Sequence, residues 1–361
     1  MTERRVAPRP LSPRRGRAPE NARRPAIGAS AAPRFADLPD DPTKRVPVSR
    51  PAATVSEIFH LLHDAGHAGH RGVLATITAL TKPGARAIGA HMAVLEGGES
   101  AGSFSSGCVE QAIIAEALAA LDEGASRSVR FGEGSRYIDI RLPCGGGMDV
   151  SFLVDPAGDV LAQAIDRLDT RQPVALRLDP AGHLALPHDP GATATGWNDG
   201  VFTVRHDPRL RLVLLGHGPE MLTSLKLART FGAEVALYSP DDAIVAAGLA
   251  KGTMAVHLLS AADPPALEGD PWTAFLFLFH DHDWEPALIR QALETPAFWI
   301  GAMGSRATHA ARRAALAAHG LAETAIARIH GPVGVIAGAR DPMTLGLSAL
   351  TEIVGAYHAL G

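Results

Sequence analysis

The stretch Leu210-Arg-Leu-Val-Leu-Leu-Gly-His-Gly-Pro219 decides the fold of the C-terminal half of the chain. Its branched apolar residues predict a buried strand, and Gly216-His-Gly218 predicts a tight turn directly after that strand. A helical pattern then extends to Phe231, and Glu234 to Tyr238 is again apolar. A strand, a turn, a helix and a second strand within about 30 residues form a βαβ unit, so we expect a parallel sheet here.

Two further units of a strand followed by a helix continue this pattern. Their strands are expected at Ala274 to Phe279 and at Phe298 to Met303, and Asp341-Pro342 is expected to cap a last helix that extends to Val354. Strands that alternate with helices are typical of a doubly wound parallel sheet. Residues 209–361 are therefore predicted to form a Rossmann-like domain.

The N-terminal half has a different order of elements. Thr54-Val-Ser-Glu57 is a capping box, which predicts a helix at 54–65. A second helix is predicted at 109–121, among β-rich segments at 73–80, 92–95, 129–131 and 148–154. Residues 51–157 are thus expected to form an α+β domain. The Asp-, Pro- and Gly-rich stretch 158–208, with a short strand at 174–178, is predicted to be a linker or a small β insert, and the fold class is α/β.

The chain begins with a basic segment. Residues 1–50 hold twelve Lys and Arg residues against five acidic ones, and nine of the 27 prolines. Because Phe35 is its one aromatic residue, the segment cannot bury enough apolar surface to offset the entropy lost on ordering. We therefore expect residues 1–50 to be a disordered arm.

The composition excludes several classes of protein. The 361 residues are enough for about two globular domains of ~150 residues each. A net charge of -4 argues against a dedicated nucleic-acid binder. The longest strongly apolar run, 274–279, is far shorter than the ~20 residues of a membrane span. Two cysteines leave no disulfide framework and indicate a reducing compartment, so the protein is predicted to be cytoplasmic.

The glycine turn of the C-terminal half is an incomplete dinucleotide fingerprint. Gly216 and Gly218 occupy the first two glycine positions, but Met221 stands at the third. The second strand ends at Ser239, where an acid that binds ribose would be expected. Binding of NAD(P) is therefore an alternative that the sequence does not favour.

Two other strand ends carry groups suited to a ligand. Gly304-Ser305-Arg306 opens a helix, whose backbone N–H groups and guanidinium make an anion site. His280-Asp-His-Asp283 follows the strand of 274–279, and we interpret it as polar loop residues that line the crevice. As metal ligands they would need partners from elsewhere, because alternate residues of an extended segment face opposite sides.

The two cysteines both lie in glycine-rich segments of the N-terminal half. Cys108 follows Gly107 at the start of the helix predicted at 109–121, where the partial positive charge favours the thiolate. Cys144 precedes Gly145 and Gly146, which expose backbone amides. We therefore expect the two cysteines to share one site.

Motifs in both halves resemble those of the XdhC/CoxI family, accessory proteins of molybdenum hydroxylases. They are Gly89-Ala-His-Met92, Gly107-Cys-Val-Glu110, Leu142-Pro-Cys-Gly-Gly146, Gly216-His-Gly218, His280-Asp-His282, Gly301-Ala-Met-Gly-Ser-Arg306, Pro332-Val-Gly334 and Gly338-Ala-Arg340. The resemblance implies a chaperone that binds molybdenum cofactor (molybdopterin), protects it during sulfuration by a cysteine desulfurase, and delivers it to an apo molybdenum hydroxylase of the xanthine dehydrogenase type. A second copy of the chain is a further candidate partner, and neither nucleic acid nor a membrane is expected.

Carried onto this sequence, the resemblance implies that Cys108 and Cys144 lie at the cofactor site, and with the motifs described above we predict a set of cofactor-binding residues. They are Arg86, Gly107, Cys108, Cys144, Gly145, Gly146, Gly216, Gly218, His280, Gly304, Ser305 and Arg306. Arg86 and Arg306 would attract the phosphate, and Cys108 is the candidate molybdenum contact, because a thiolate is a soft ligand. Binding and hand-over, rather than turnover catalysis, are expected.

Two alternatives remain from the residues themselves. The first is an NAD(P)-dependent oxidoreductase that uses Cys108 as a redox thiol. The second is a thiol switch in which Cys108 and Cys144 pair reversibly.

Overall fold

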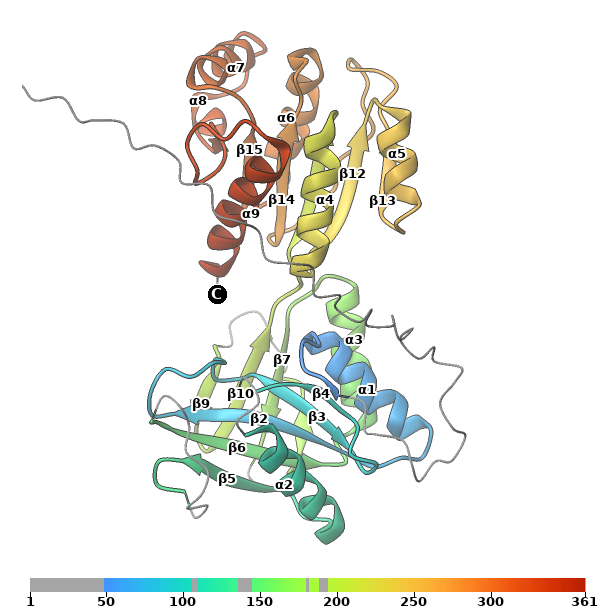
Figure 1. Cartoon of the computed structure of the whole chain (residues 1–361), viewed down its shortest axis with the longest axis vertical. Helices are drawn as coiled ribbons and strands as arrows, with labels where there is room; N and C mark the ends of the chain where they lie inside the picture. The colour runs from blue at the N-terminus through green and yellow to red at the C-terminus, as the bar shows by residue number, and fades with distance from the viewer. Residues whose placement is uncertain (1–48, 106–108, 136–144, 180–181, 188–193, 361) are drawn as a thin grey trace, which may run out of the picture. The chain divides into compact units, whose positions relative to one another are not determined.

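The computed structural model describes residues 49–105, 109–135, 145–179, 182–187 and 194–360. Within these ranges the chain forms three sheets and their helices (Figure 1). In the described residues, no helix is long and apolar enough to cross a bilayer.

The first sheet has six strands in the order β1-β4-β3-β2-β6-β5. The strands are β1 (Ser49–Arg50), β2 (Gly72–Leu80), β3 (His91–Leu95), β4 (Ser100–Gly102), β5 (Arg127–Gly132) and β6 (Gly147–Val154). Alternate residues of β2 face opposite sides, so Val73, Ala75 and Ile77 pack with helix α2 (Glu110–Glu123), whereas Leu74 packs with helix α1 (Val55–His67). The strands and helices predicted for this half are confirmed.

The start of α1 has the predicted capping box. The Thr54 Oγ1 accepts a hydrogen bond from the Glu57 N–H, and the Glu57 carboxylate accepts one from the Thr54 N–H at 2.7 Å. Hydrogen bonds from the backbone and side chain of Thr54 lower the pKa of Glu57. Just before this helix, Ser49 and Arg50 pair with Ser100 and Ala101, so these last two residues of the predicted arm belong to the sheet. Residues 1–48 lie outside the described ranges.

The second sheet is antiparallel, with the strand order β8-β7-β10-β9. The strands are β7 (Val174–Leu178), β8 (Leu184–Ala185), β9 (Gly196–Asn198) and β10 (Val201–His206). Helix α3 (Gly158–Asp169) precedes it and was not predicted from the sequence. Its apolar stripe consists of the buried residues Leu161, Ala164 and Ile165, flanked by the partly buried Val160 and Leu168. This stripe packs with α1 and the second sheet in one core.

The third sheet is entirely parallel, with the order β13-β12-β11-β14-β15-β16. Its strands are β11 (Arg211–Gly216), β12 (Glu234–Ser239), β13 (Met254–His257), β14 (Thr273–Leu278), β15 (Trp299–Ala302) and β16 (Ile329–His330). Helices α4 (Pro219–Phe231), α5 (Asp242–Leu249) and α9 (Pro342–His358) share the core on one face, and α6 (Glu285–Glu294), α7 (Arg306–Ala318) and α8 (Glu323–Ile326) share the core on the other. The predicted Rossmann-like doubly wound sheet is confirmed.

The register of this sheet brings three strand ends together. Gly216 at the end of β11 pairs with Leu278 at the end of β14, and Phe277 pairs with Ala302 at the end of β15. A Cβ on Gly216 would lie 2.5 Å from the Leu278 carbonyl oxygen, so only glycine lets these strands end side by side. Ligands bind open α/β sheets at this carboxyl edge.

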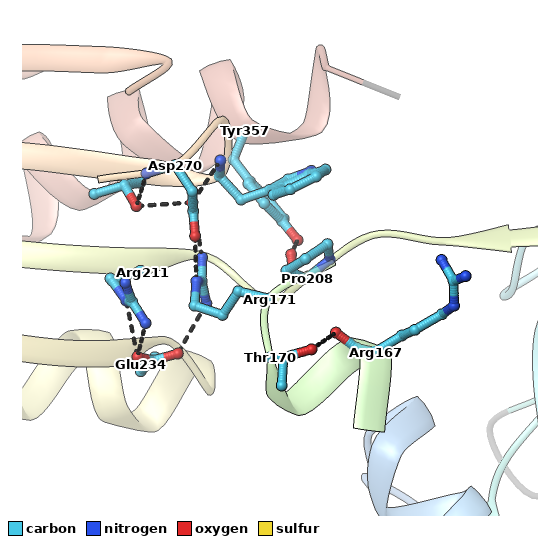
Figure 2. Close-up of polar contacts among 10 residues, drawn as sticks. Arg167, Thr170, Arg171, Pro208, Arg211, Glu234, Asp270 and Tyr357 are labelled. Carbon is cyan, nitrogen blue, oxygen red and sulfur yellow. Dashed lines mark hydrogen bonds and ion pairs between the residues drawn. The ribbon is translucent and has the colours of Figure 1, made fainter. Parts of the chain in front are cut away.

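An arginine after α3 joins the second and third sheets through side-chain contacts (Figure 2). The Arg171 guanidinium donates two hydrogen bonds to the Asp270 carboxylate and one to Glu234 Oε2 at 2.8 Å. Arg211 binds the other oxygen of Glu234, and the Tyr357 hydroxyl donates to the Pro208 carbonyl at 2.9 Å. Burial of Asp270 would raise its pKa, but hydrogen bonds from Arg171 and Thr273 outweigh that effect and lower it.

Candidate functional site

A cavity of about 690 Å³ lies at the carboxyl edge of the third sheet. Its polar lining includes Glu220, His280, His282, Ser305, Thr308, Arg306 and Arg340, and most of the remaining lining residues lie within 332–339. A second cavity of about 490 Å³ lies beside the opposite ends of β11 and β12, where Arg211 and Glu234 already pair with each other. The first cavity is the candidate site because it is the larger of the two and because it lies at the carboxyl edge of the sheet, where ligands bind such folds.

The start of α7 forms the anion-attracting side of this cavity. Ser305 is the N-cap residue, and its Oγ accepts a hydrogen bond from the Thr308 N–H at 3.1 Å. Gly304 just before it has a φ of 140°, and a Cβ there would lie 2.8 Å from Thr308 Cγ2. Arg306, the first residue of the helix, is exposed and forms no ion pair with a described residue. A guanidinium and a helix N-terminus together attract an anion.

The segment between β16 and α9 supplies a second arginine. The Gly334 N–H donates to Glu352 Oε2 at 2.6 Å, and the Ile336 N–H donates to Ser348 Oγ at 2.7 Å, so α9 holds this segment in place. Arg340 at its end is exposed, and it too forms no ion pair within the described ranges. Arg340 was not predicted to be a site residue, although it belongs to the family motif Gly338-Ala-Arg340. The cavity thus has two cations available for one ligand.

The carboxylate of Glu220 lies against the glycine turn of Gly216-His-Gly218. Gly218 has a φ of 92°, and a Cβ there would lie 2.9 Å from Glu220 Oε2. Glu220 is the second residue of α4, where a dinucleotide fold would hold a pyrophosphate. Repulsion between the two negative charges opposes that arrangement. Met221 is fully buried in the core, and Ser239 at the end of β12 is also buried.

The histidines after β14 contact acidic residues. His280 Nε2 lies 3.7 Å from Glu220 Oε2, and His282 Nδ1 lies 3.2 Å from Glu285 Oε1. Glu285 is buried and forms a two-bond ion pair with Arg312, so its charge is already neutralised. The described residues include no cluster of three or more side chains suited to a metal ion. His280 and His282 line the cavity.

The loop between β2 and β3 contacts two other predicted site segments. Arg86 Nε donates to the Ser103 carbonyl at 3.2 Å, and Lys82 Nζ donates to the Gly145 carbonyl at 2.8 Å. A Cβ on Gly146 would lie 3.0 Å from Lys82 Cβ. The loop therefore holds Gly145, the chain neighbour of Cys144, and Ser103, which lies shortly before Cys108. Gly107, Cys108 and Cys144 themselves lie outside the described residues.

A carboxylate organises the chain just before α2. Glu110 accepts hydrogen bonds from the backbone N–H groups of Phe104, Ser105 and Val109. Burial would raise the pKa of Glu110, but hydrogen bonds from the side chain and backbone of Ser105 outweigh that effect and lower it. An ionised carboxylate thus lies at the start of the helix that follows Cys108, and it competes with any thiolate for the positive charge there.

Known proteins match this chain in both halves. Residues 65–132 match the XdhC and CoxI family, and residues 212–353 match the XdhC Rossmann domain. A protein of Escherichia coli (strain K12) named molybdenum cofactor insertion chaperone PaoD is 34% identical over 285 residues, which cover 79% of this chain and 83% of PaoD. The chain belongs to the XdhC/CoxI family.

Two further proteins are similar to this XdhC/CoxI protein. The uncharacterized protein YqeB of Escherichia coli (strain K12) is 31% identical over 170 residues, which cover 45% of the chain and 31% of YqeB. A solved structure from Bacillus halodurans, described as a xanthine dehydrogenase, has a TM-score of 0.68 and 19% identity, and the match covers 84% of this chain and 96% of that one. At 19% identity, the similarity to the Bacillus halodurans structure shows that the two proteins share a fold.

The fold of this XdhC/CoxI protein gathers part of the predicted site. His280, Gly304, Ser305 and Arg306 line the carboxyl-edge cavity. Gly216 and Gly218 do not line it, but they shape the turn that positions Glu220 beside it. Arg86, Gly145 and Gly146 lie in the N-terminal part, around the loop between β2 and β3. Sequence reasoning missed Lys82, Glu220 and Arg340, whose roles depend on contacts between distant segments.

Proposed function

We propose that this protein binds molybdenum cofactor, protects it during sulfuration and delivers it to an apo molybdenum hydroxylase. The observation that carries the proposal is the carboxyl-edge cavity, where Arg306, Arg340 and the start of α7 supply positive charge without an acidic partner among the described residues. A molybdopterin ends in a phosphate, which these groups fit. The similarity to PaoD, which is named an insertion chaperone for this cofactor, supports the same assignment.

The cavity also fits the rest of such a cofactor. Its volume of about 690 Å³ lies within the range of ligand sites for small molecules and cofactors. A buried carboxylate, Glu220, faces it as an acceptor for N–H groups, and a pterin ring carries such groups. When bound, the cofactor supplies the molybdenum and dithiolene chemistry, and this chain binds and shelters it.

The two cysteines are proposed to face the metal end of the cofactor. Lys82 and Arg86 of the loop between β2 and β3 hold the backbone near the two cysteine-bearing segments. These contacts lie in the N-terminal half, and Arg171 joins that half to the edge of the third sheet opposite the cavity, so this part of the proposal rests on the family resemblance. A soft thiolate is a suitable neighbour for molybdenum, and Cys108 is the proposed contact. The proposed partners are the apo hydroxylase, which receives the cofactor, and the cysteine desulfurase, which supplies sulfur. Formation of a homodimer and a cytoplasmic location stay predictions.

The test compares protein purified from a host that makes molybdenum cofactor with protein from a host that does not. Bound molybdenum and pterin are measured, together with activation of an apo hydroxylase. We expect both components only from the competent host, and less of both in the double variant Arg306→Ala/Arg340→Ala. The matched control, Arg177→Ala, changes an exposed arginine of β7 far from the cavity in sequence and fold.

Two further measurements test the molybdenum contact of Cys108 and the alternative of an NAD(P)-dependent oxidoreductase. Unchanged cofactor binding and hydroxylase activation in Cys108→Ser would remove the molybdenum contact while leaving the chaperone role. Tight binding of NAD(P)H without any molybdenum or pterin would favour the oxidoreductase instead. The carboxylate over the glycine turn argues against that result.

A further inference from the structure

Glu220 is a buried carboxylate with an unsatisfied oxygen. The residue is 8% exposed, and its Oε2 is inaccessible to solvent and has no hydrogen-bond partner within the described part of the chain. The nearest basic atom, His280 Nε2, lies at 3.7 Å, which is beyond hydrogen-bond distance. An unpaired buried carboxylate oxygen is costly, and such groups in folded proteins usually have a partner. A ligand that donates hydrogen bonds would supply one.

The surroundings of Glu220 point to a particular kind of ligand. Glu220 lines the same cavity as Arg306 and Arg340, but it is buried whereas both arginines are exposed. A ligand that satisfies all three has N–H donors at its inner end and an anionic group at its outer end. A metal ion is a poor occupant, since the described residues hold no cluster of metal-binding side chains.

We propose that Glu220 accepts hydrogen bonds from the edge of a 2-amino-4-oxopyrimidine ring, with the phosphate of the same ligand at Arg306 and Arg340. This edge carries a ring N–H and an exocyclic amino group side by side, and a carboxylate binds such a pair through both oxygens. Binding in this way requires the exposed His280 side chain, whose Nε2 lies 3.7 Å from Oε2, to move aside and open Oε2 to the ligand. Pterins and guanine share the edge. The inference rests on the proposed function, which supplies a pterin with a phosphate as the ligand.

The position of Glu220 also gives the Rossmann fold a different use. Its carboxylate lies over Gly218, where a nicotinamide dinucleotide would place a pyrophosphate. In this proposal the residue next to the turn accepts hydrogen bonds from a heterocycle. The anion site lies at the start of α7, which follows β15, two strands away from β11 in the sheet. Glu220 thus adds to Met221 and Ser239 as a departure from a dinucleotide site, and in this proposal it binds another ligand.

Binding of three probes to the full chain tests this assignment. The probes are the oxidised, metal-free fluorescent derivative of molybdopterin, which retains the pterin and the phosphate, and the nucleotides GMP and IMP. IMP has the ring N–H but lacks the amino group. We expect the pterin probe to bind, and Glu220→Gln to weaken its binding at least tenfold, because the amide NH₂ opposes the donor edge. The control Glu294→Gln, an exposed glutamate of α6, should bind the probe as the wild type does.

The two nucleotides show whether the bound 2-amino-4-oxopyrimidine edge can belong to guanine as well as to a pterin. GMP that binds at least tenfold more tightly than IMP supports the aminopyrimidine assignment, with guanine as an accepted source; binding of the pterin probe alone supports it with a pterin as the source. This comparison uses the wild type, so it holds even where a variant fails to fold. Equal binding of GMP and IMP, or of the pterin probe to wild type and folded Glu220→Gln, would overturn the assignment.

The outcome also differs from a failure of the proposed function. Wild-type protein that contains molybdenum and pterin, together with Glu220→Gln that contains as much of both, would overturn only the role of Glu220. Wild-type protein that binds no molybdenum cofactor in a competent host would overturn the proposed function itself. Thermal melting shows whether Glu220→Gln is folded.

Discussion

His91 and His206 face each other through their Nε2 atoms at 2.9 Å, with the ring of Phe59 packed against both. His91 also lies 2.8 Å from the Thr76 hydroxyl through its Nδ1. Burial lowers the pKa of His206 to about 4, and burial together with His206 lowers the pKa of His91 well below its ordinary value. One proton can lie between the two nitrogens, but two would repel each other at this position, where His91 is buried and His206 partly buried.

This pair predicts a loss of stability in mild acid. A histidine whose pKa is lower in the folded state binds fewer protons there than in the unfolded state, so its contribution is fully present above the unfolded pKa of about 6.5 and declines as the pH falls towards 4. For His206 alone, the free energy of unfolding should fall by about 2 kcal/mol between pH 7 and pH 4.5. Urea denaturation at a series of pH values measures this change in the free energy of unfolding.

Replacing one partner should flatten that profile. His206→Gln cannot titrate, so the loss between pH 6.5 and 4.5 should shrink by about half or more, while stability at pH 7 falls through the altered packing. His319→Gln, at an exposed position after α7, is the control and should retain the wild-type slope. Identical slopes in all three proteins would show that the facing pair is not the source.

Gly216 and Gly355 should respond to alanine with opposite signs. In Gly216→Ala the new Cβ would meet the Leu278 carbonyl oxygen at 2.5 Å, so the third sheet must shift, and we expect a loss of about 2 kcal/mol or more. Gly355 lies exposed inside α9 with no atom near its missing Cβ, and Gly355→Ala should stabilise the protein by about 0.5–1 kcal/mol. Thermal melting of both variants is sufficient. If Gly216→Ala has the same melting temperature as the wild type, the close approach of Gly216 to the Leu278 carbonyl oxygen is contradicted.

The ion pair of Arg171 with Asp270 should matter more than a surface ion pair. Arg171 has only 9% of its side chain exposed, so Asp270→Asn leaves a nearly buried guanidinium with Glu234 as its remaining acidic partner, and we expect a loss of about 2 kcal/mol. Glu99→Gln removes the exposed partner of Arg50 and should cost less than about 1 kcal/mol. Equal losses, measured by denaturant unfolding, would contradict this ranking.

Inorganic phosphate should bind the carboxyl-edge cavity weakly and in competition with salt. Removing one of two cations that share an anion, as in Arg340→Ala, should weaken phosphate binding about three- to tenfold. Raising the ionic strength should weaken it further, because exposed charges are screened. Isothermal titration in low and high salt measures both effects. If Arg340→Ala and Arg177→Ala bind phosphate equally well, Arg340 has no part in the anion site.

The sequence predicted the third sheet well because its signals are local. The four central strands, β12, β11, β14 and β15, are almost entirely buried and appear as continuous apolar runs, and the turn after β11 carries its own glycines. The edge strands were not predicted, because β13 is partly exposed and β16 has only two residues. Helix α3 has apolar residues at helical spacing (160, 161, 164, 165 and 168), and it was missed because it was grouped with the Asp-, Pro- and Gly-rich residues that follow it. Packing against α1 and the second sheet, rather than local preference, stabilises it.

The site was predicted less completely for a related reason. Ser305 and Arg306 could be predicted because a helix start follows a strand in the sequence itself. Glu220 could not, since an acidic residue in the first turn of a helix is ordinary, and only the fold shows that its Oε2 is buried without a partner. The same holds for Lys82, whose bond to the Gly145 carbonyl joins segments 63 residues apart.

The difference in burial between Glu220 and the two arginines gives the cavity a direction. A molecule held at both ends would present its charged tail to solvent and its flat ring to the interior. The tail would therefore be the first part that a receiving protein could grasp, while the ring remained shielded until the last contact broke. Transfer could then proceed without the heterocycle passing through water on its own.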